Sequence, residues 1–140
     1  MGVAAEIAAF LVMGRWLHRY GPFRLIQVTL ILASLRWVII ALFADVFPML
    51  FLAQLLHAAS FGMGHVVATH WVHRLFRGPH QVRGQALYSS MSFGAGSALG
   101  ILGSGYLWES YGSVSTYLLA AAVAAAALLI ARVGLRRHPH

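Results

Sequence analysis

The chain has 140 residues, of which 60% are hydrophobic and 9% are charged, and its mean hydropathy is +0.76. This balance excludes an ordinary soluble domain, because a folded soluble surface needs far more charge. Apolar runs of about 20 residues recur along the whole length and match the roughly 30 Å of hydrocarbon that a helix must cross. The composition therefore predicts an all-α, polytopic membrane helix bundle with the lipid bilayer as its solvent.

All basic residues of the chain are arginine, and the formal net charge is +7. In a soluble protein such a charge would indicate nucleic-acid binding. Here the arginines lie in the gaps between apolar runs, where they set membrane topology, so we do not expect a nucleic-acid partner. Cysteine is absent, which excludes disulfides and thiolate metal sites. A cleaved signal peptide is not expected, because no basic region precedes the first apolar run and Glu6 interrupts that run.

The apolar runs and their boundaries predict five membrane-spanning helices in one domain, residues 1–140. The first is short, because the roughly 13 residues before Arg15 rise only about 20 Å. Pro22 suits the first turn of the second helix, and Gly78–Pro79 marks the turn before the fourth. The predicted spans cover about residues 2–17, 22–44, 47–74, 85–108 and 113–133.

The arginines in the connectors and at the adjoining span ends alternate from one connector to the next. The second and fourth connectors carry Asp45 and Glu109 and no arginine. The first connector, the third connector and the C-terminal tail carry Arg15, Arg19, Arg24, Arg74, Arg77, Arg83, Arg132, Arg136 and Arg137. Because arginine is retained on the cytoplasmic side, we expect a cytoplasmic C-terminus and an N-terminus outside.

Two charged residues of opposite sign, Glu6 and Arg36, fall inside predicted spans. Each lies about 13 Å of helix rise from the charged end of its span, near the middle of the membrane. A charge at that depth costs about 2.5–3.5 kcal/mol on insertion scales. One interpretation is a structural ion pair that joins two helices. The other is that Glu6 takes up and releases a proton in a transport cycle, with Arg36 as its partner or as a ligand for an anion.

Polar residues on one face of the third span form the second candidate site. His57, Phe61 and His65 are spaced four residues apart, and Gln54 precedes His57 by three, so the four side chains share a face. One interpretation is hydrogen bonding to neighbouring helices. The other is a hydrated interior surface, on which histidine binds substrate or relays a proton.

Neither a metal site nor enzyme chemistry is expected. His70 and His73 have a spacing that a metal could use, but no carboxylate or cysteine accompanies them. No nucleophile stands beside a base, so we predict no catalytic residue and no cofactor.

Small residues recur at every fourth position of the fourth span. Such a stripe allows another helix backbone to approach closely, and we interpret it as a helix-packing face. Additional glycines in the same span would also permit a rocking motion. The stripe consists of Ser92, Gly96, Gly100 and Ser104.

The connector after the first span resembles a known motif. Gly14, His18, Arg19 and Gly21, with Arg24 beyond, resemble the cytoplasmic loop motif of the major facilitator superfamily, a glycine followed by an Asp-Arg pair, a second glycine and further basic residues. His18 stands where the aspartate is usual. Such departures are common in the second copy of the motif, which fits a C-terminal half and leaves a gating salt bridge at this position in question.

More specifically, short motifs along almost the whole chain resemble the phenylpropionate permease group of that superfamily. They are Ala5-Glu6, Arg36-Trp37, the Gln54 to His65 series, Gln85-Ala86 with Tyr88-Ser89, and Gly105-Tyr106-Leu107. The resemblance implies helices eight to twelve of a twelve-helix transporter, a partial major facilitator fold that lacks the N-terminal half and helix seven. Removing seven spans from a protein with both termini inside leaves an outward N-terminus, as the arginines predict.

The resemblance also implies a function and its residues. It implies part of a secondary active transporter of a bacterial inner membrane, with proton-coupled symport of an aromatic or other small organic acid. Its partners would then be the missing N-terminal half, the acid and a proton. The implied roles are proton coupling by Glu6 and His57, and substrate binding by Arg36, Gln54, His57, Phe61 and His65. The alternative is a small structural or assembly membrane protein without transport activity of its own.

Overall fold

The computed structural model describes the backbone of residues 2–136 and the side chains of that range except at positions 2, 3, 5, 6, 9, 135 and 136. Within this range the chain is helical and contains no strand, as predicted. The helices are α1 (Gly2–Tyr20), α2 (Pro22–Phe43), α3 (Phe47–Leu75), a short 3-10 turn η1 (Gly78–His80), α4 (Gln81–Ser89), a π-helix η2 (Ser90–Ala95) and α5 (Gly96–Arg136).

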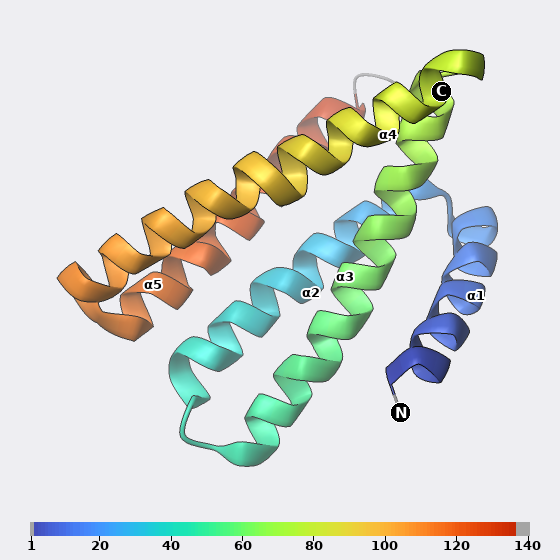
Figure 1. Ribbon diagram of the computed structural model, residues 1–140. Helices are drawn as coiled ribbons and strands as arrows, with labels where there is room; N and C mark the ends of the chain where they lie inside the picture. Colours follow the sequence, from blue (N-terminus) through green and yellow to red (C-terminus); the bar gives the residue numbers. More distant parts are fainter. Residues whose placement is uncertain (1, 137–140) are drawn as a thin grey trace.

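Three glycines with positive φ reverse the chain at points that the sequence marks as turns. Gly21 has φ 78° and Gly78 has φ 60°, and proline follows each of them at the start of the next helical segment. Gly112, inside α5, has φ 83° and ψ 176°, and Figure 1 shows the helix folding back sharply within α5. Only glycine adopts these conformations without strain, so three of the four predicted reversals rest on this residue.

Residues 2–136, the described part of the chain, contain three helices long and apolar enough to cross a membrane, where the sequence predicted five. They are Pro22–Phe43, Phe47–Leu75 and the continuous path Gly78–Gly134. The prediction divided this third path into two spans, and the fold-back at Gly112 lies where that division was placed. The helix α1 is not among the three candidates. It continues three residues past its predicted end, with His18 and Arg19 in its last turn.

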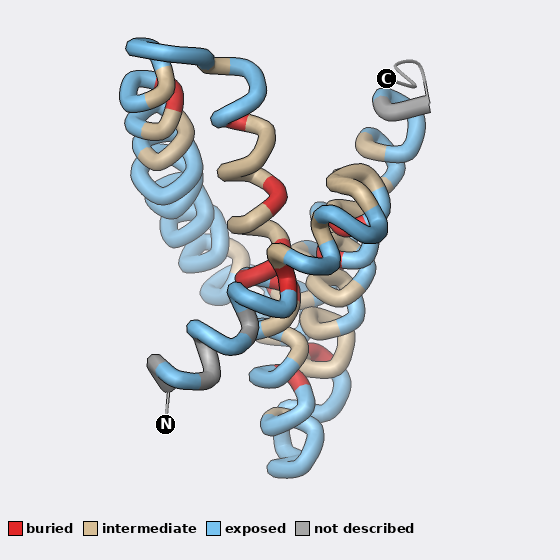
Figure 2. The backbone as a smooth tube through the Cα atoms, turned by 90° about the vertical axis from the view of Figure 1, so that its right-hand side faces the viewer, coloured by how far each residue is buried: buried red, intermediate tan, exposed pale blue. Residues whose placement is uncertain are grey.

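The helix α2 lies between α3 and α5, while α1 packs mainly against α3. The interior is small, and its core is formed by Met13, Leu25, Met63 and Val67 from α1, α2 and α3. Most of the remaining surface is exposed (Figure 2) and includes many large apolar side chains. This pattern is typical of a helix bundle in a membrane, where exposed apolar side chains contact lipid tails and need not be buried in a protein core.

The charged connectors gather at the ends of the bundle as the arginine pattern predicts. The α1–α2 connector, the α3–α4 connector and the last turns of α5 lie at one end, at the upper right of Figure 1. The α2–α3 connector and the fold-back of α5 lie toward the other. Within the described chain, the connectors that carry arginine therefore lie toward one end of the bundle, and the α2–α3 connector, which contains Asp45, lies toward the other.

The packing of α4 against Phe76, the residue that follows α3, is tight at Gly84, which is buried. A methyl group built on Gly84 overlaps the side chain of Phe76, whereas one built on Gly100 meets nothing within 4 Å. We expect Gly84→Ala to lower the stability of the protein by about 1–3 kcal/mol, the usual cost of overpacking. The measurement is the midpoint of thermal unfolding in detergent, with Gly100→Ala as the matched control. Equal midpoints for the two variants would contradict this account of the contact.

Candidate functional site

Arg36 of α2 and His57 of α3 meet between two helices that can cross a membrane. The Nη1 atom of Arg36 lies 2.5 Å from Nδ1 of His57. A guanidinium carries donors and no acceptor, so Arg36 donates and His57 Nδ1 accepts through its lone pair. His57 is therefore the neutral imidazole with its proton on Nε2.

Aromatic rings support the guanidinium of Arg36 on its other side. Its central carbon lies 4.0 Å from the centre of the Trp37 ring, a favourable cation–π position. Trp37 stacks on Tyr117 of α5, with ring centroids 5.7 Å apart and planes inclined by 19°. Tyr117 in turn meets Trp108 edge-on at 5.7 Å. Because Trp108 and Tyr117 flank the fold-back of α5, this reversal is part of what positions Arg36.

The charge of Arg36 is only partly satisfied. Among the side chains that the structure describes, His57 is its hydrogen-bond partner, and its Nε–H is buried without one. A buried donor of a charged group without an acceptor is costly. The arrangement leaves donors on the guanidinium for an anion, and a carboxylate matches their geometry.

A cluster of rings continues from His57 toward the arginine-rich end of the bundle. The His57 ring lies 5.8 Å from Phe61, and Phe61 stacks on His65 at 6.3 Å with planes inclined by 9°. Phe10 of α1 meets His65 edge-on at 6.4 Å, and Phe93 of η2 lies 6.3 Å from it. Three helical segments thus contribute to one aromatic surface around His65.

The two histidines of the predicted face differ in their polar contacts. His57 makes a helix-to-helix hydrogen bond through Arg36. The Nδ1 atom of His65 is buried and has no partner among the described side chains. The same holds for Thr69 Oγ1, one turn along α3, and for Gln85 Oε1 on α4. Buried polar atoms are nearly always hydrogen-bonded. These three atoms are therefore suited to hydrogen-bond water or a polar group of a substrate.

Two predicted site residues remain apart from this arrangement. Gln54 is exposed on α3, about one turn before His57, and the structure shows no hydrogen bond for it among the described side chains. Glu6 lies in α1, but its side chain is outside the described part of the structure. Its pairing with Arg36 and its role in proton coupling therefore stay predictions, as does substrate binding by Gln54.

Comparison with known proteins gives the family of the chain. Residues 1–119 match the model of the MFS_1 like family. The chain belongs to this family of major facilitator transporters. Family membership and the apolar helices together make it an integral membrane protein and point to a transporter rather than an enzyme.

The MFS_1-like chain is also similar to the probable 3-phenylpropionic acid transporter of Escherichia coli (strain K12), with 26% identity over 112 residues. The similarity covers 80% of this chain and 29% of that relative, so the chain spans less than a third of the length of the relative. No solved structure matches the chain.

The loop motif of the MFS_1-like chain lies at a helix end rather than in an open loop. Its residues up to Arg19 belong to the last turns of α1, and Arg24 is already in the first turn of α2. Gly21 alone joins the two helices. The Nδ1–H of His18 donates to the carbonyl of Gly14, one turn back in α1, at 2.9 Å. The sequence predicts a basic connector over Arg15–Arg24, and the structure corrects this, because nearly all of that segment is helical.

The predicted packing stripe of the MFS_1-like chain is not covered by another helix of the described chain. Ser92, Gly96, Gly100 and Ser104 are all exposed. A methyl group on Gly100 meets nothing within 4 Å, and one on Gly96 meets only the chain's own Met91 carbonyl. The stripe therefore stays a prediction about a partner helix outside this chain.

Phe93 is the site residue that sequence reasoning missed. It follows Tyr88 by five residues, and the two rings meet edge-on at 6.2 Å. In a regular α-helix a spacing of five turns side chains about 140° apart, so periodicity gave no reason to group them. The π-helix η2 changes this register, and such segments carry no distinctive sequence pattern.

The hydrogen bonds of the two histidines predict opposite tautomers. His57 should carry its proton on Nε2 and His18 on Nδ1, because the first accepts from Arg36 and the second donates to a carbonyl. Nitrogen-15 NMR of histidine-labelled protein in detergent measures this, with His57→Asn and His18→Asn for assignment. In Arg36→Gln the spectrum of His57 should change while that of His18 stays the same. A doubly protonated His57 in the unchanged protein would contradict the described contact.

Proposed function

We propose that the chain is part of a secondary active transporter that couples the uptake of a small organic acid, aromatic acids included, to a proton. The observation that carries this proposal is the hydrogen bond between Arg36 and His57, which joins the apolar helices α2 and α3. Family membership supports transport, and the similarity to the probable 3-phenylpropionic acid transporter of E. coli supports an aromatic acid as one substrate.

The Arg36–His57 contact provides a route to coupling. While His57 is neutral, its Nδ1 lone pair occupies a donor of Arg36. A proton on Nδ1 removes that acceptor and places two positive charges side by side, which disfavours the protonated state on its own. A carboxylate bound to Arg36 supplies the missing acceptor and the opposite charge. Proton and acid therefore each favour the binding of the other, as symport requires.

The position of Arg36 also favours transport over a purely structural role. A guanidinium at mid-membrane depth costs about 2.5–3.5 kcal/mol, and an apolar residue would serve helix packing without that cost. A neutral histidine offsets only part of it. An anion that enters, binds and leaves accounts for a cationic site whose Nε–H has no acceptor among the side chains that the structure describes.

In the proposed architecture the chain crosses the membrane five times, as helices eight to twelve of a major facilitator fold. The path Gly78–Gly134 supplies two crossings separated at Gly112, and α1 supplies the first. The arginine-rich end faces the cytoplasm of a bacterial inner membrane, which places the N-terminus of this chain outside. A further set of helices, the N-terminal half of the transporter, forms the opposite wall of the substrate path.

The direct test is uptake of radiolabelled 3-phenylpropionate by membrane vesicles that contain the transporter including this chain, with and without an imposed pH gradient. We expect accumulation that a protonophore abolishes. Arg36→Gln should raise the half-saturating concentration by about 30-fold or more, the usual cost of losing one partner of a charge pair. Wild-type vesicles that take up no organic acid would instead favour the structural or assembly role.

His57→Gln separates binding from coupling. The glutamine amide oxygen can still accept from Arg36, but it cannot take up a proton at neutral pH. We expect accumulation against a gradient to be lost while exchange of labelled for unlabelled acid persists. Leu55→Met, at an exposed apolar position of the same helix, is the control and should retain both. Undiminished accumulation in His57→Gln would remove His57 from the coupling mechanism.

Glu6→Gln tests the remaining predicted coupling residue. If Glu6 carries a transported proton, the variant should fail to accumulate the acid and should still exchange it, because glutamine cannot release a proton. Counterflow and gradient-driven uptake, measured in the same vesicles, distinguish the two activities. Full accumulation in this variant would exclude a role for Glu6 in coupling.

A further inference from the structure

A π-helix interrupts the otherwise α-helical path from α4 to α5. In η2 the N–H of Gly96 donates to the carbonyl of Met91, five residues earlier, which is the π pattern. A methyl group on Gly96 would lie 3.2 Å from that same carbonyl oxygen, so glycine suits the end of this wide turn. π-Helical turns are rare, and within α-helices they frequently mark functional sites.

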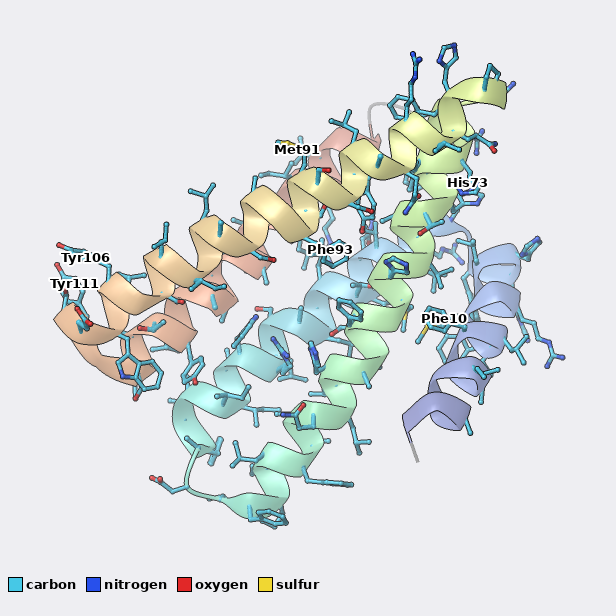
Figure 3. All side chains as sticks on the ribbon, in the orientation of Figure 1. Phe10, His73, Met91, Phe93, Tyr106 and Tyr111 are labelled. Atoms are coloured by element: carbon cyan, nitrogen blue, oxygen red, sulfur yellow. The ribbon has the colours of Figure 1, made fainter. Side chains whose placement is uncertain are left out.

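The π-helix orients the side chain of Phe93 toward α3. Figure 3 shows Phe93 on the side of η2 that faces the bundle and Met91 on the opposite side. The Phe93 ring lies 6.4 Å from Phe61 and 6.3 Å from His65. No Cα atom of η2 comes within 8 Å of one in α3, and both segments belong to the described chain. The Phe93 ring therefore reaches α3 across a gap between the two backbones.

The bridged surface is open. Phe61 is 53% exposed and Phe93 is 47% exposed, so each ring retains a free face. Tyr88 meets Phe93 edge-on, and this contact restricts the orientation of the ring. Phe61 and Phe93 therefore form an aromatic surface that is positioned by its neighbours but not filled by them.

This surface lies at a fixed distance from the anion site. Phe61 is one helical turn from His57, which is about 6 Å along the axis of α3. An acid whose carboxylate binds Arg36 would thus place a group at the end of a short aliphatic spacer against Phe61 and Phe93. An aromatic ring in that place makes offset or edge-to-face contacts that an aliphatic group of equal size cannot make.

We propose that Phe93, positioned by the π-helix η2, is a specificity-determining residue that selects acids bearing an aromatic ring. The inference rests on the proposed function, since the acid is held at Arg36. It adds Phe93 as the second wall of the ring-binding surface, whose first wall is Phe61. The π-helix contributes by orienting Phe93 toward that surface.

The test compares two acids of nearly equal size, 3-phenylpropionate and 3-cyclohexylpropionate, in vesicles that contain the complete transporter. Phe93→Leu should raise the half-saturating concentration for the phenyl acid about five- to tenfold, in line with the strength of aromatic pairs. The value for the cyclohexyl acid should change less than about twofold, because leucine keeps the surface apolar. Phe93→Tyr should retain the wild-type preference. Met91→Leu, on the other side of the same π-helix, is the matched control and should change neither value.

Different results distinguish this inference from the proposed function. An equal rise for both acids in Phe93→Leu, or a wild type without preference between them, overturns the role of Phe93 and leaves organic-acid transport intact. Wild-type vesicles that take up neither acid overturn the proposed function, and the ring-binding role with it. If Phe93→Leu fails to accumulate in the membrane, Phe61→Leu carries the same test, because the opposite wall should produce the same selective loss.

Discussion

The guanidinium of Arg36 sets the central constraint of this bundle, because a charge within apolar helices must be held by specific partners or leave the membrane. His57 accepts its hydrogen bond from α3, and Trp37 stacks against it with support from Tyr117 of α5. These contacts require α2 to lie between α3 and α5, which is the observed packing. The fold-back at Gly112 brings the second part of α5 to the position from which Tyr117 reaches Trp37.

Around this charge the bundle combines tight and loose packing. The α1–α2–α3 junction is close: methyl groups built on Gly62 and Gly64 would lie 3.0 Å from Met13 and Thr29. Between α3 and η2, by contrast, the backbones stay apart and aromatic side chains span the gap. A transporter needs both, since rigid contacts hold the charged site in place while an uncovered surface admits the substrate. The exposed Phe61 and Phe93 lie on this second, open side.

Local signals explain which features could be predicted. Pro22, Gly78 and Gly112 mark chain reversals by their own backbone preferences, so the turns were predicted at the right places. The four-residue spacing on α3 correctly placed Phe61 beside His57 and His65, because helix periodicity determines faces. Helix ends were less predictable: the first connector is a single glycine, because α1 continues to Tyr20, past its last apolar run.

By itself, the sequence determined that this is a helical membrane protein with arginine at one end of its bundle, that a charge lies inside it, and that α3 has a polar face. Composition and periodicity are local properties, and each of these features depends only on them. The tertiary structure alone decided that Arg36 meets His57 and that Phe93 completes the aromatic surface. Those contacts depend on the register between helices, and in the case of Phe93 on a π-helix that shifts the register within one. The register between two helices and the register shift at a π-helix are not encoded in the spacing of residues along a single helix.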